Sequence, residues 1–417
     1  MFRVSCRLTL SLLFVSALAA QPVPPIVEKL LADPALDQAR RFIESNESRV
    51  IEYQVSLTEV PAPPFEESVR AEVYRKHFEE RGLRDVRIDV EGNVIGVRPG
   101  RSDSPNVVLS AHLDTVFPAE TDVKVRREGT VLHAPGIGDD GRGLAVLLGV
   151  IDALNHAGVE TEGPITFVGT VGEEGLGDLR GVKHLFGEEL KGEIDRFISV
   201  DGTALGVTSS GVGSYRYRTA FTGPGGHSYG AFGMPNPIHA MGRLIAKVSE
   251  FQTPSDPRTT FSVGRVFGGT SVNSIAFEAA FEIDMRSVDP VALEALNKKF
   301  LAAADEALAE EKARWDSSRP LELEVKRVGL RPAGETPADS PEVRAAVALT
   351  EAIDGPVTLR GGSTDANVGM SMGIPSITIG GGGRGRGAHS PGEWFDTADS
   401  WKGTERALLV VVAFASM

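Results

Sequence analysis

Residues 107–116 read VVLSAHLDTV, an apolar run that leads directly into His112 and Asp114. Residues 107–110 are predicted to form a buried strand. Downstream, residues 144–154 are apolar on most faces, as a helix packed against a sheet would be. A second apolar strand is predicted over residues 165–171. This strand–helix–strand order favours a mostly parallel sheet with helices on both faces.

Predicted strands and helices also occur on either side of this unit. Further short strands are predicted over residues 197–200 and 376–379, and a strongly apolar element closes the chain at 408–415. Residues 36–57 and 66–82 have the apolar spacing of helices. The predicted fold class is therefore α/β, with a mostly parallel sheet and helices on both faces.

Residues 211–330 show a different pattern. Strands are predicted over residues 215–221, 260–267, 276–287 and 321–328, with helices that begin after Asn236 and Asp289. The order strand–helix–strand–strand–helix–strand is that of a ferredoxin-like α+β sandwich. We interpret it as a domain inserted between residues 21–210 and 331–417, which together make the α/β domain.

The first 20 residues have the pattern of a secretory signal peptide. Arg3 and Arg7 precede an uncharged run over residues 8–20, which ends near the small residues Ala17 and Ala19. That run is shorter than the roughly 20 residues that a membrane-spanning helix needs. We therefore expect a secreted or periplasmic protein that does not span a membrane.

Composition excludes several classes of protein. Hydrophobic residues make up 41% and charged residues 24% of the 417 residues, which excludes a disordered chain. The formal net charge of −14 argues against nucleic-acid binding, which needs a basic surface. A single cysteine, Cys6, excludes an internal disulfide and a cysteine-based zinc site.

Residues of types that can bind metal ions lie at the ends of the predicted strands or in the loops between them. These residues are His112, Glu174, Asp201 and, through a glycine-rich loop, His389, with Asp139 in a loop between the first two. Taken singly, each motif has a simpler explanation, such as a helix cap or a solvated acidic turn. Together they are expected to meet, because ligands of open α/β sheets bind beyond the carboxyl ends of the strands.

The donor set indicates which metals to expect. Two histidines and three carboxylates without a thiolate suit zinc, cobalt or manganese. Five ligands, one of which can bridge, fit two metal ions better than one. Two ions roughly 3.5–4 Å apart can polarise a carbonyl and activate a water between them.

Nine segments resemble one known family, the zinc exopeptidases and deacylases that include peptidase T, bacterial glutamate carboxypeptidase and aminoacylase. They occur in the family's order and cover nearly the whole chain after residue 20; they read SAHLDTVFP, GIGDDGRG, VGEEGLGDLRG, SVDG, TGPGGHSYG, GGTSVNSIA, GLRPAGE, GGSTDA and GAHSPGEW. The resemblance implies a catalytic α/β domain with an inserted lid or dimerisation domain.

The resemblance also implies two divalent metal ions per chain, with zinc expected first and cobalt or manganese as alternatives. One metal would take His112, Asp139 and Asp201. The other would take Asp139, Glu174 and His389, so that Asp139 bridges the two. The peptide bond between Asp139 and Asp140 would be cis.

Catalytic and substrate-binding roles follow from the same resemblance. Asp114 would orient His112, and Glu173 would act as the general base on a metal-bridging water. Asn273 and Arg331 would hold the substrate, and His227, also in the substrate-binding set, would stabilise the tetrahedral oxyanion, often from a partner subunit. A homodimer through the lid domain is therefore expected.

The expected activity is that of an exopeptidase on short peptides, and specifically an aminopeptidase like peptidase T. Relatives that recognise a free amino group tend to carry Asp at the position of Asp201, whereas carboxypeptidases and many deacylases tend to carry Glu. A carboxypeptidase or an N-acyl-amino-acid deacylase is the alternative. A peptide-binding protein without catalysis is the more remote one, because every implied metal ligand and Glu173 are present.

Overall fold

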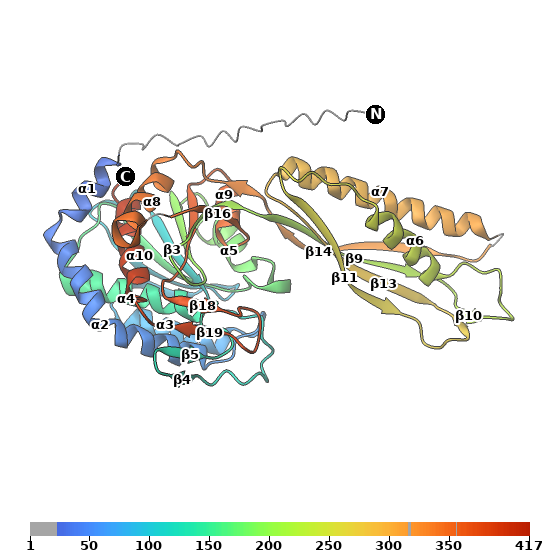
Figure 1. Ribbon diagram of the computed structural model, residues 1–417, viewed down its shortest axis with the longest axis horizontal. Coiled ribbons are helices and arrows are strands. Elements are labelled where there is room, and N and C mark those ends of the chain that lie inside the picture. The colour runs from blue at the N-terminus through green and yellow to red at the C-terminus, as the bar shows by residue number, and fades with distance from the viewer. Residues whose placement is uncertain (1–22, 316–317, 356) are drawn as a thin grey trace, which may run out of the picture.

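The computed structural model describes residues 23–315, 318–355 and 357–417. A larger α/β body and a smaller elongated body follow one another along its long axis (Figure 1). The signal peptide predicted at residues 1–20 lies outside the described residues. Within the described ranges, no helix has both the length and the apolar character that crossing a membrane requires.

A nine-stranded sheet forms the centre of the larger body. Its order is β1-β2-β6-β3-β7-β17-β8-β15, and β16 also pairs with β8. The neighbours β6, β3, β7 and β17 run parallel, whereas the pairs towards both edges, except β16 with β8, are antiparallel. The strands are β1 (Arg84–Ile88), β2 (Val94–Arg98), β3 (Val107–His112), β6 (Ile165–Thr170), β7 (Arg196–Val200), β8 (Val207–Gly211), β15 (Gly334–Glu335), β16 (Leu359–Gly362) and β17 (Ser376–Ile379).

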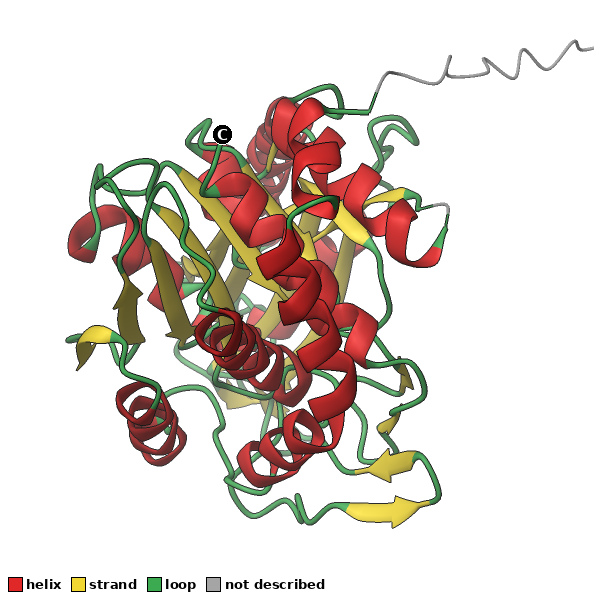
Figure 2. Cartoon of the chain, turned by 90° about the vertical axis from the view of Figure 1, so that its left-hand side faces the viewer, coloured by secondary structure: helices red, strands yellow, loops and turns green. Residues whose placement is uncertain are grey.

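Helices cover both faces of this sheet, because the central strands are apolar on both sides. Along β3, Val107 and Leu109 join one core cluster and Val108 joins another. The first cluster lies under the helices seen in front of the sheet in Figure 2: α1 (Pro25–Leu31), α2 (Pro34–Thr58), α3 (Ser68–Glu80), α4 (Gly141–Ala157), α8 (Pro341–Asp354) and α10 (Trp401–Phe414). On the other face lie α5 (Arg180–His184), the adjoining π-helical turn (Leu185–Glu189) and α9 (Ala366–Ser371). The α/β fold predicted from the sequence is confirmed.

The smaller body is an antiparallel sheet covered by two helices. Its strand order, β11-β13-β9-β14, is that of a ferredoxin-like sandwich. The strands are β9 (Gly213–Thr222), β11 (Thr259–Gly268), β13 (Glu278–Ser287) and β14 (Glu322–Arg331), and the helices are α6 (Pro237–Ser249) and α7 (Pro290–Arg314). Asn236 and Asp289 cap the two helices through their side chains, as predicted. We refer to this body as the lid and propose for it the boundaries 211 and 330.

Short strands complete the fold. A hairpin-like pair, β10 (Gly226–His227) with β12 (Ser274–Ile275), lies at the far end of the lid (Figure 1). Four strands form a small sheet, seen below the central one in Figure 1: β4 (Arg126–Glu128), β5 (Val131–His133), β18 (Arg384–Arg386) and β19 (Trp394–Asp396). A short 3-10 turn (Gly175–Gly177) follows Glu174. In the small sheet, β5, which leads into the loop of Asp139, pairs with β19, which follows the turn of His389.

Candidate metal centre and active site

The central parallel strands bring the predicted metal ligands together. His112 is the last residue of β3, and Glu173 and Asp201 follow the neighbouring strands β6 and β7 closely. Since β3 pairs in parallel with both β6 and β7, all three carboxyl ends lie at one edge of the sheet. The loops of Asp139 and His389 reach the same edge.

Asp139 lies between the two histidines. Its Oδ1 is 3.0 Å from His112 Nε2, and its Oδ2 is 3.2 Å from His389 Nε2. His389 Nε2 is also 2.9 Å from Glu174 Oε1. Burial raises the pKa of Asp139, but its hydrogen bonds with the two imidazoles outweigh this and hold the pKa below its usual range. One carboxylate thus offers a separate oxygen to each side of the cluster.

The backbone of Asp114 orients His112. His112 Nδ1 lies 2.9 Å from the Asp114 carbonyl oxygen and 3.7 Å from the Asp114 carboxylate. We assign the ring proton to Nδ1 from this contact, which leaves Nε2 facing Asp139 as a free ligand atom. The Asp114 side chain has a second task, because it accepts hydrogen bonds from the backbone N–H groups of Glu173 and Glu174 at 3.0 and 2.8 Å.

Asp140 fixes the start of α4 beside the cluster. The Asp139–Asp140 peptide is cis, as the resemblance implied. Asp140 caps α4 by accepting from the N–H of Gly143, and it accepts from the N–H of His112 at 3.1 Å. Asp140 is therefore the helix cap of the acidic pair. The side chain of Asp139 contacts His112 and His389 instead.

The donor atoms are close enough to share metal ions. Ligand atoms of His112, Asp140 and Asp201 lie within 4.8 Å of one another, as do those of His112, Asp139 and Glu174. Burial, reinforced by the charge of Asp139, raises the pKa of Asp201 to about 7. Carboxylates crowded in this way repel one another unless cations lie between them. Imidazole and carboxylate donors without thiolates fit divalent ions such as zinc, cobalt or manganese.

Glu173 and Arg331 form a buried ion pair at the wall of the site. Arg331 Nη1 donates to Glu173 Oε1 at 2.8 Å, and Arg331 Nη2 donates to the Glu173 carbonyl oxygen. Burial raises the pKa of Glu173 well above its usual value, against the lowering effect of the Arg331 guanidinium. Arg331 therefore contacts the predicted general base directly, a contact that the sequence does not show.

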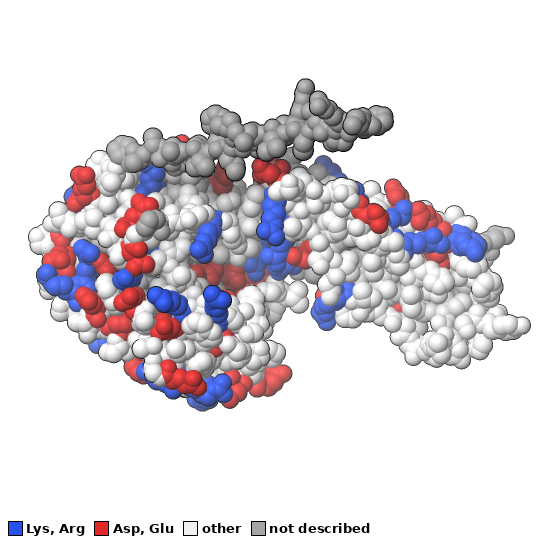
Figure 3. All heavy atoms as spheres, viewed as in Figure 1, with Lys and Arg blue, Asp and Glu red and all other residues white. Residues whose placement is uncertain are grey.

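A pocket of about 570 Å³ opens in front of these groups. Figure 3 shows the hollow between the two bodies. Apart from the residues described above, the pocket is lined by residues that sequence reasoning did not place there, namely Val116, Gly175, Arg216, Asp284, Arg286, Ser363 and Thr364. Asp284 pairs with two lid arginines of the pocket, with Arg216 Nε at 3.1 Å and Arg286 Nε at 2.6 Å. Arg286 lies two residues after Asp284 on β13, and Arg216 lies directly opposite Asp284 on the neighbouring strand β9.

His227 and Asn273 are not brought to this pocket within one chain. Both are exposed, and they lie on or next to β10 and β12 at the far end of the lid (Figure 1). The backbone carbonyl of Asn273 accepts from the N–H of Ser228, which joins the two segments. The ten-residue strands β9 and β13 of the lid separate these two residues from the metal centre. A single chain therefore does not bring all the predicted site residues together.

Residues 108–412 match the sequence model of one protein family, described as peptidase family M20/M25/M40. This range covers well over half of the chain. The chain belongs to peptidase family M20/M25/M40. As an M20 protein with clustered metal-ligating side chains, it is a metal-binding hydrolase of a peptidase family.

Relatives of this M20 chain share most of its length. The protein YqjE of Bacillus subtilis is 27% identical over 351 residues, which cover 80% of this chain and 90% of YqjE. Carboxypeptidase G2 of a Pseudomonas species is 27% identical over 320 residues, 74% of each chain. A tripeptidase structure from Staphylococcus aureus superposes with a TM-score of 0.72 at 22% identity, over 89% of this chain and 99% of the tripeptidase. These likenesses establish the catalytic-plus-lid architecture.

Proposed function

We propose that this M20 protein is an exopeptidase that hydrolyses short peptides, and more specifically an aminopeptidase. We propose further that each chain binds two divalent metal ions, with zinc expected first and cobalt or manganese as alternatives. The observation that carries the proposal is the position of Asp139, with one oxygen on His112 and the other on His389. A carboxylate placed in this way suits the bridge between two cations.

The proposed ligand sets are those that the family resemblance implies, and the contacts of Asp139 with His112 and His389 and of His389 with Glu174 support them. One ion would be held by His112, Asp139 and Asp201, and the other by Asp139, Glu174 and His389. When bound, the two ions polarise the scissile carbonyl and activate a water molecule. The chain's own contribution is to hold these donors in place, largely through the hydrogen bonds that Asp114 and Asp140 accept from the backbone.

Glu173 would act as the general base. It lines the pocket next to Glu174, and its burial keeps its pKa raised, which makes its carboxylate a better proton acceptor. Arg331 holds one carboxylate oxygen at 2.8 Å, which leaves the other oxygen to take a proton from the attacking water and pass it to the leaving nitrogen. Arg331 is thereby assigned a second role besides contact with the substrate.

The direction of attack rests on Asp201. Asp is one methylene shorter than Glu, which leaves room and negative potential beside the metal centre for a substrate ammonium group. The competing candidate, a carboxypeptidase or N-acyl-amino-acid deacylase, is favoured by the lid arginines. Arg286 is bound to Asp284 through Nε, and guanidinium groups are well suited to binding a substrate carboxylate.

A free tripeptide is expected to be hydrolysed at least tenfold faster than its N-acetylated form, with release of the N-terminal residue. An acetyl group removes the positive charge that the space near Asp201 would accommodate, and a factor of ten corresponds to roughly 1.4 kcal/mol. Chromatographic identification of the released residue is the measurement. Release of the C-terminal residue, or faster cleavage of the acetylated peptide, would establish the competing candidate instead.

We further propose that two chains pair through their lids, so that His227 reaches the pocket of the partner subunit. His227 lies among exposed apolar side chains at the far end of the lid, including Tyr229, Phe232, Val272 and Phe277. That end of the lid carries few charged side chains on the face seen in Figure 3. An exposed apolar patch of this kind is typical of an association surface.

The variants His227→Ala and Glu173→Gln are expected to be nearly inactive separately but to complement each other when mixed. Loss of an oxyanion donor lowers kcat by roughly 10²–10³-fold. After exchange of subunits, activity should return to about one quarter of the wild-type rate, because half of the randomly paired dimers are mixed and each holds one intact site. A mixture as inactive as its components would show that His227 does not act across subunits.

Export of the protein remains our proposal from the composition of its first 20 residues. A positively charged start, an uncharged apolar run and small residues near position 20 support a cleaved secretory signal. Secretion or a periplasmic location would suit an enzyme without a structural need for cysteine, since Cys6 is the only one in the chain.

A further inference from the structure

Glu393 is a buried carboxylate that holds the loop of Asp139. Its Oε2 accepts from the N–H of Gly136 at 2.7 Å, and its Oε1 accepts from the N–H groups of Gly138 and Asp139 at 2.8 and 3.1 Å. The residue is only 3% exposed. Three backbone donors of one short loop thus converge on a single side chain.

Backbone dipoles supply the charge compensation of this carboxylate. Within the described part of the chain, no ion pair joins Glu393 to a lysine, arginine or histidine. The loop is shaped for the contact, because Gly136 has a φ of +77° and a Cβ on Gly138 would lie 3.2 Å from Glu393 Oε1. A buried carboxyl group that accepts three converging N–H groups makes the position of those groups depend on it.

His389 stands on the same turn as Glu393. The turn is closed by hydrogen bonds from Ser390 N–H to the Gly387 carbonyl and from Glu393 N–H to the Ser390 carbonyl. Immediately after it, β19 pairs with β5, which leads into the Asp139 loop. Glu393 therefore joins the loop of one metal ligand to the turn of another.

We propose that Glu393 is a positioning residue that sets the separation of Asp139 and His389 and so the affinity of the metal centre. This inference rests on the proposed function, because it takes these two residues as metal ligands. Asp139 Oδ2 and His389 Nε2 lie 3.2 Å apart, and Glu393 accepts a hydrogen bond from the backbone of Asp139 while its own backbone belongs to the turn that carries His389. Outer groups that orient metal ligands typically change metal affinity 10–100-fold when they are altered.

Glu393→Gln is expected to weaken binding of at least one zinc equivalent 10–100-fold, measured by equilibrium dialysis of the full chain against buffered zinc. The amide keeps the shape of the side chain, but its NH₂ group faces a backbone N–H and leaves that donor without an acceptor. Saturating zinc is expected to restore kcat and leave KM unchanged. A residue with a merely structural role would not produce this dependence on zinc concentration.

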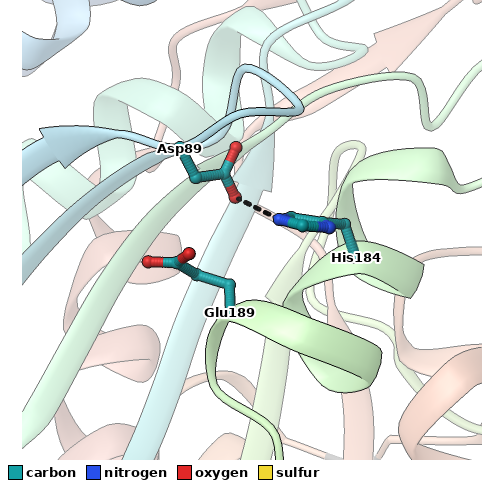
Figure 4. Close-up of side chains that lie close together, drawn as sticks. All are labelled: Asp89, His184 and Glu189. Atoms are coloured by element: carbon teal, nitrogen blue, oxygen red, sulfur yellow. Dashed lines mark ion pairs between the residues drawn. The ribbon is translucent and has the colours of Figure 1, made fainter.

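Asp89→Asn is the matched control. Asp89 also has a fully buried side chain, and its Oδ1 accepts from three backbone N–H groups, those of Glu91, Gly92 and Asn93. Its Oδ2 lies 3.9 Å from His184 Nε2, with Glu189 nearby (Figure 4), and none of these three residues belongs to the proposed ligand sets of the metal centre. Glu189 is already paired with Arg87, so this group is explained by protein contacts. We expect the control to lower the melting temperature while zinc affinity stays within about threefold, below the range expected for a metal-orienting group.

Gly138→Ala provides a second variant that keeps the charge of Glu393. The added Cβ would approach Thr203 Cγ2 at 2.9 Å and Glu393 Oε1 at 3.2 Å, so the Thr203 methyl must shift and the carboxylate must move by a few tenths of an ångström relative to the loop. It is expected to reproduce the loss of zinc affinity. Unchanged affinity in both site variants, or an equal loss in Asp89→Asn, would overturn the role of Glu393. If the wild type binds zinc but cleaves no peptide, the proposed function fails while this comparison still decides the role of Glu393.

Discussion

Glu173→Gln is expected to lower kcat by roughly 10²–10⁴-fold while the chain keeps its two metal ions. The amide occupies the same buried place beside Arg331 and can still accept the hydrogen bond from Arg331 Nη1. It cannot take a proton from the attacking water. Steady-state rates on the best peptide substrate, together with metal content by elemental analysis, test both halves of this expectation.

The neighbouring residue is the natural control for this variant. Glu174→Gln changes the next side chain, whose backbone N–H is held by the same Asp114 carboxylate. Because Glu174 Oε1 lies 2.9 Å from His389 Nε2, this variant should lose metal rather than only activity. If Glu173→Gln kept most of its activity, or lost metal as Glu174→Gln does, Glu173 would not be the general base.

Removal of the metal ions is expected to abolish activity, by roughly 10³-fold or more, because bound cations supply several kcal/mol of charge stabilisation in the transition state. Dialysis against a chelator, followed by titration with zinc, cobalt or manganese, measures the loss and its reversal. Recovery should be complete near two equivalents per chain. Full activity in the chelated protein would exclude a metal-dependent reaction.

His389→Ala examines the same centre from within the chain. The His389 side chain is 56% exposed, so its truncation removes a ligand without opening a cavity in the core. Metal occupancy should fall with little change in the melting temperature. His239→Ala on α6 is the matched control, because its side chain is 58% exposed and lies on the lid. Equal occupancy in the two variants would remove His389 from the metal set.

Much of the architecture could be predicted because burial leaves a pattern along the chain. The strands β3, β6 and β7 are apolar on both faces, and the structure places alternate residues of β3 in two different cores. The helices of the lid begin where Asn236 and Asp289 precede proline. The closing apolar element is the helix α10, which is buried on nearly all sides and therefore shows no amphipathic face by which its type could be recognised.

The mixed character of the central sheet could not be predicted in the same way. Strands β6, β3, β7 and β17 are parallel, as expected, but β1, β2, β8 and β15 add antiparallel pairs at the edges. Strand direction at an edge depends on the path of the connecting chain. Local apolar patterns carry no information about that path.

The amino-acid sequence by itself determined which kind of site this protein has, a metal centre. The tertiary structure decided which of the predicted residues lie close together. Residue types at strand ends indicated a metal centre, because parallel strands deliver their carboxyl ends to one edge. The pairing of Glu173 with Arg331 and the grip of Glu393 on the Asp139 loop join residues more than 150 positions apart. His227 and Asn273 lie at the far end of the lid, on or next to the short strands β10 and β12, and not at the metal centre. Contacts of this kind depend on how loops from separate strands meet in space. No local sequence pattern specifies the distance between two such loops.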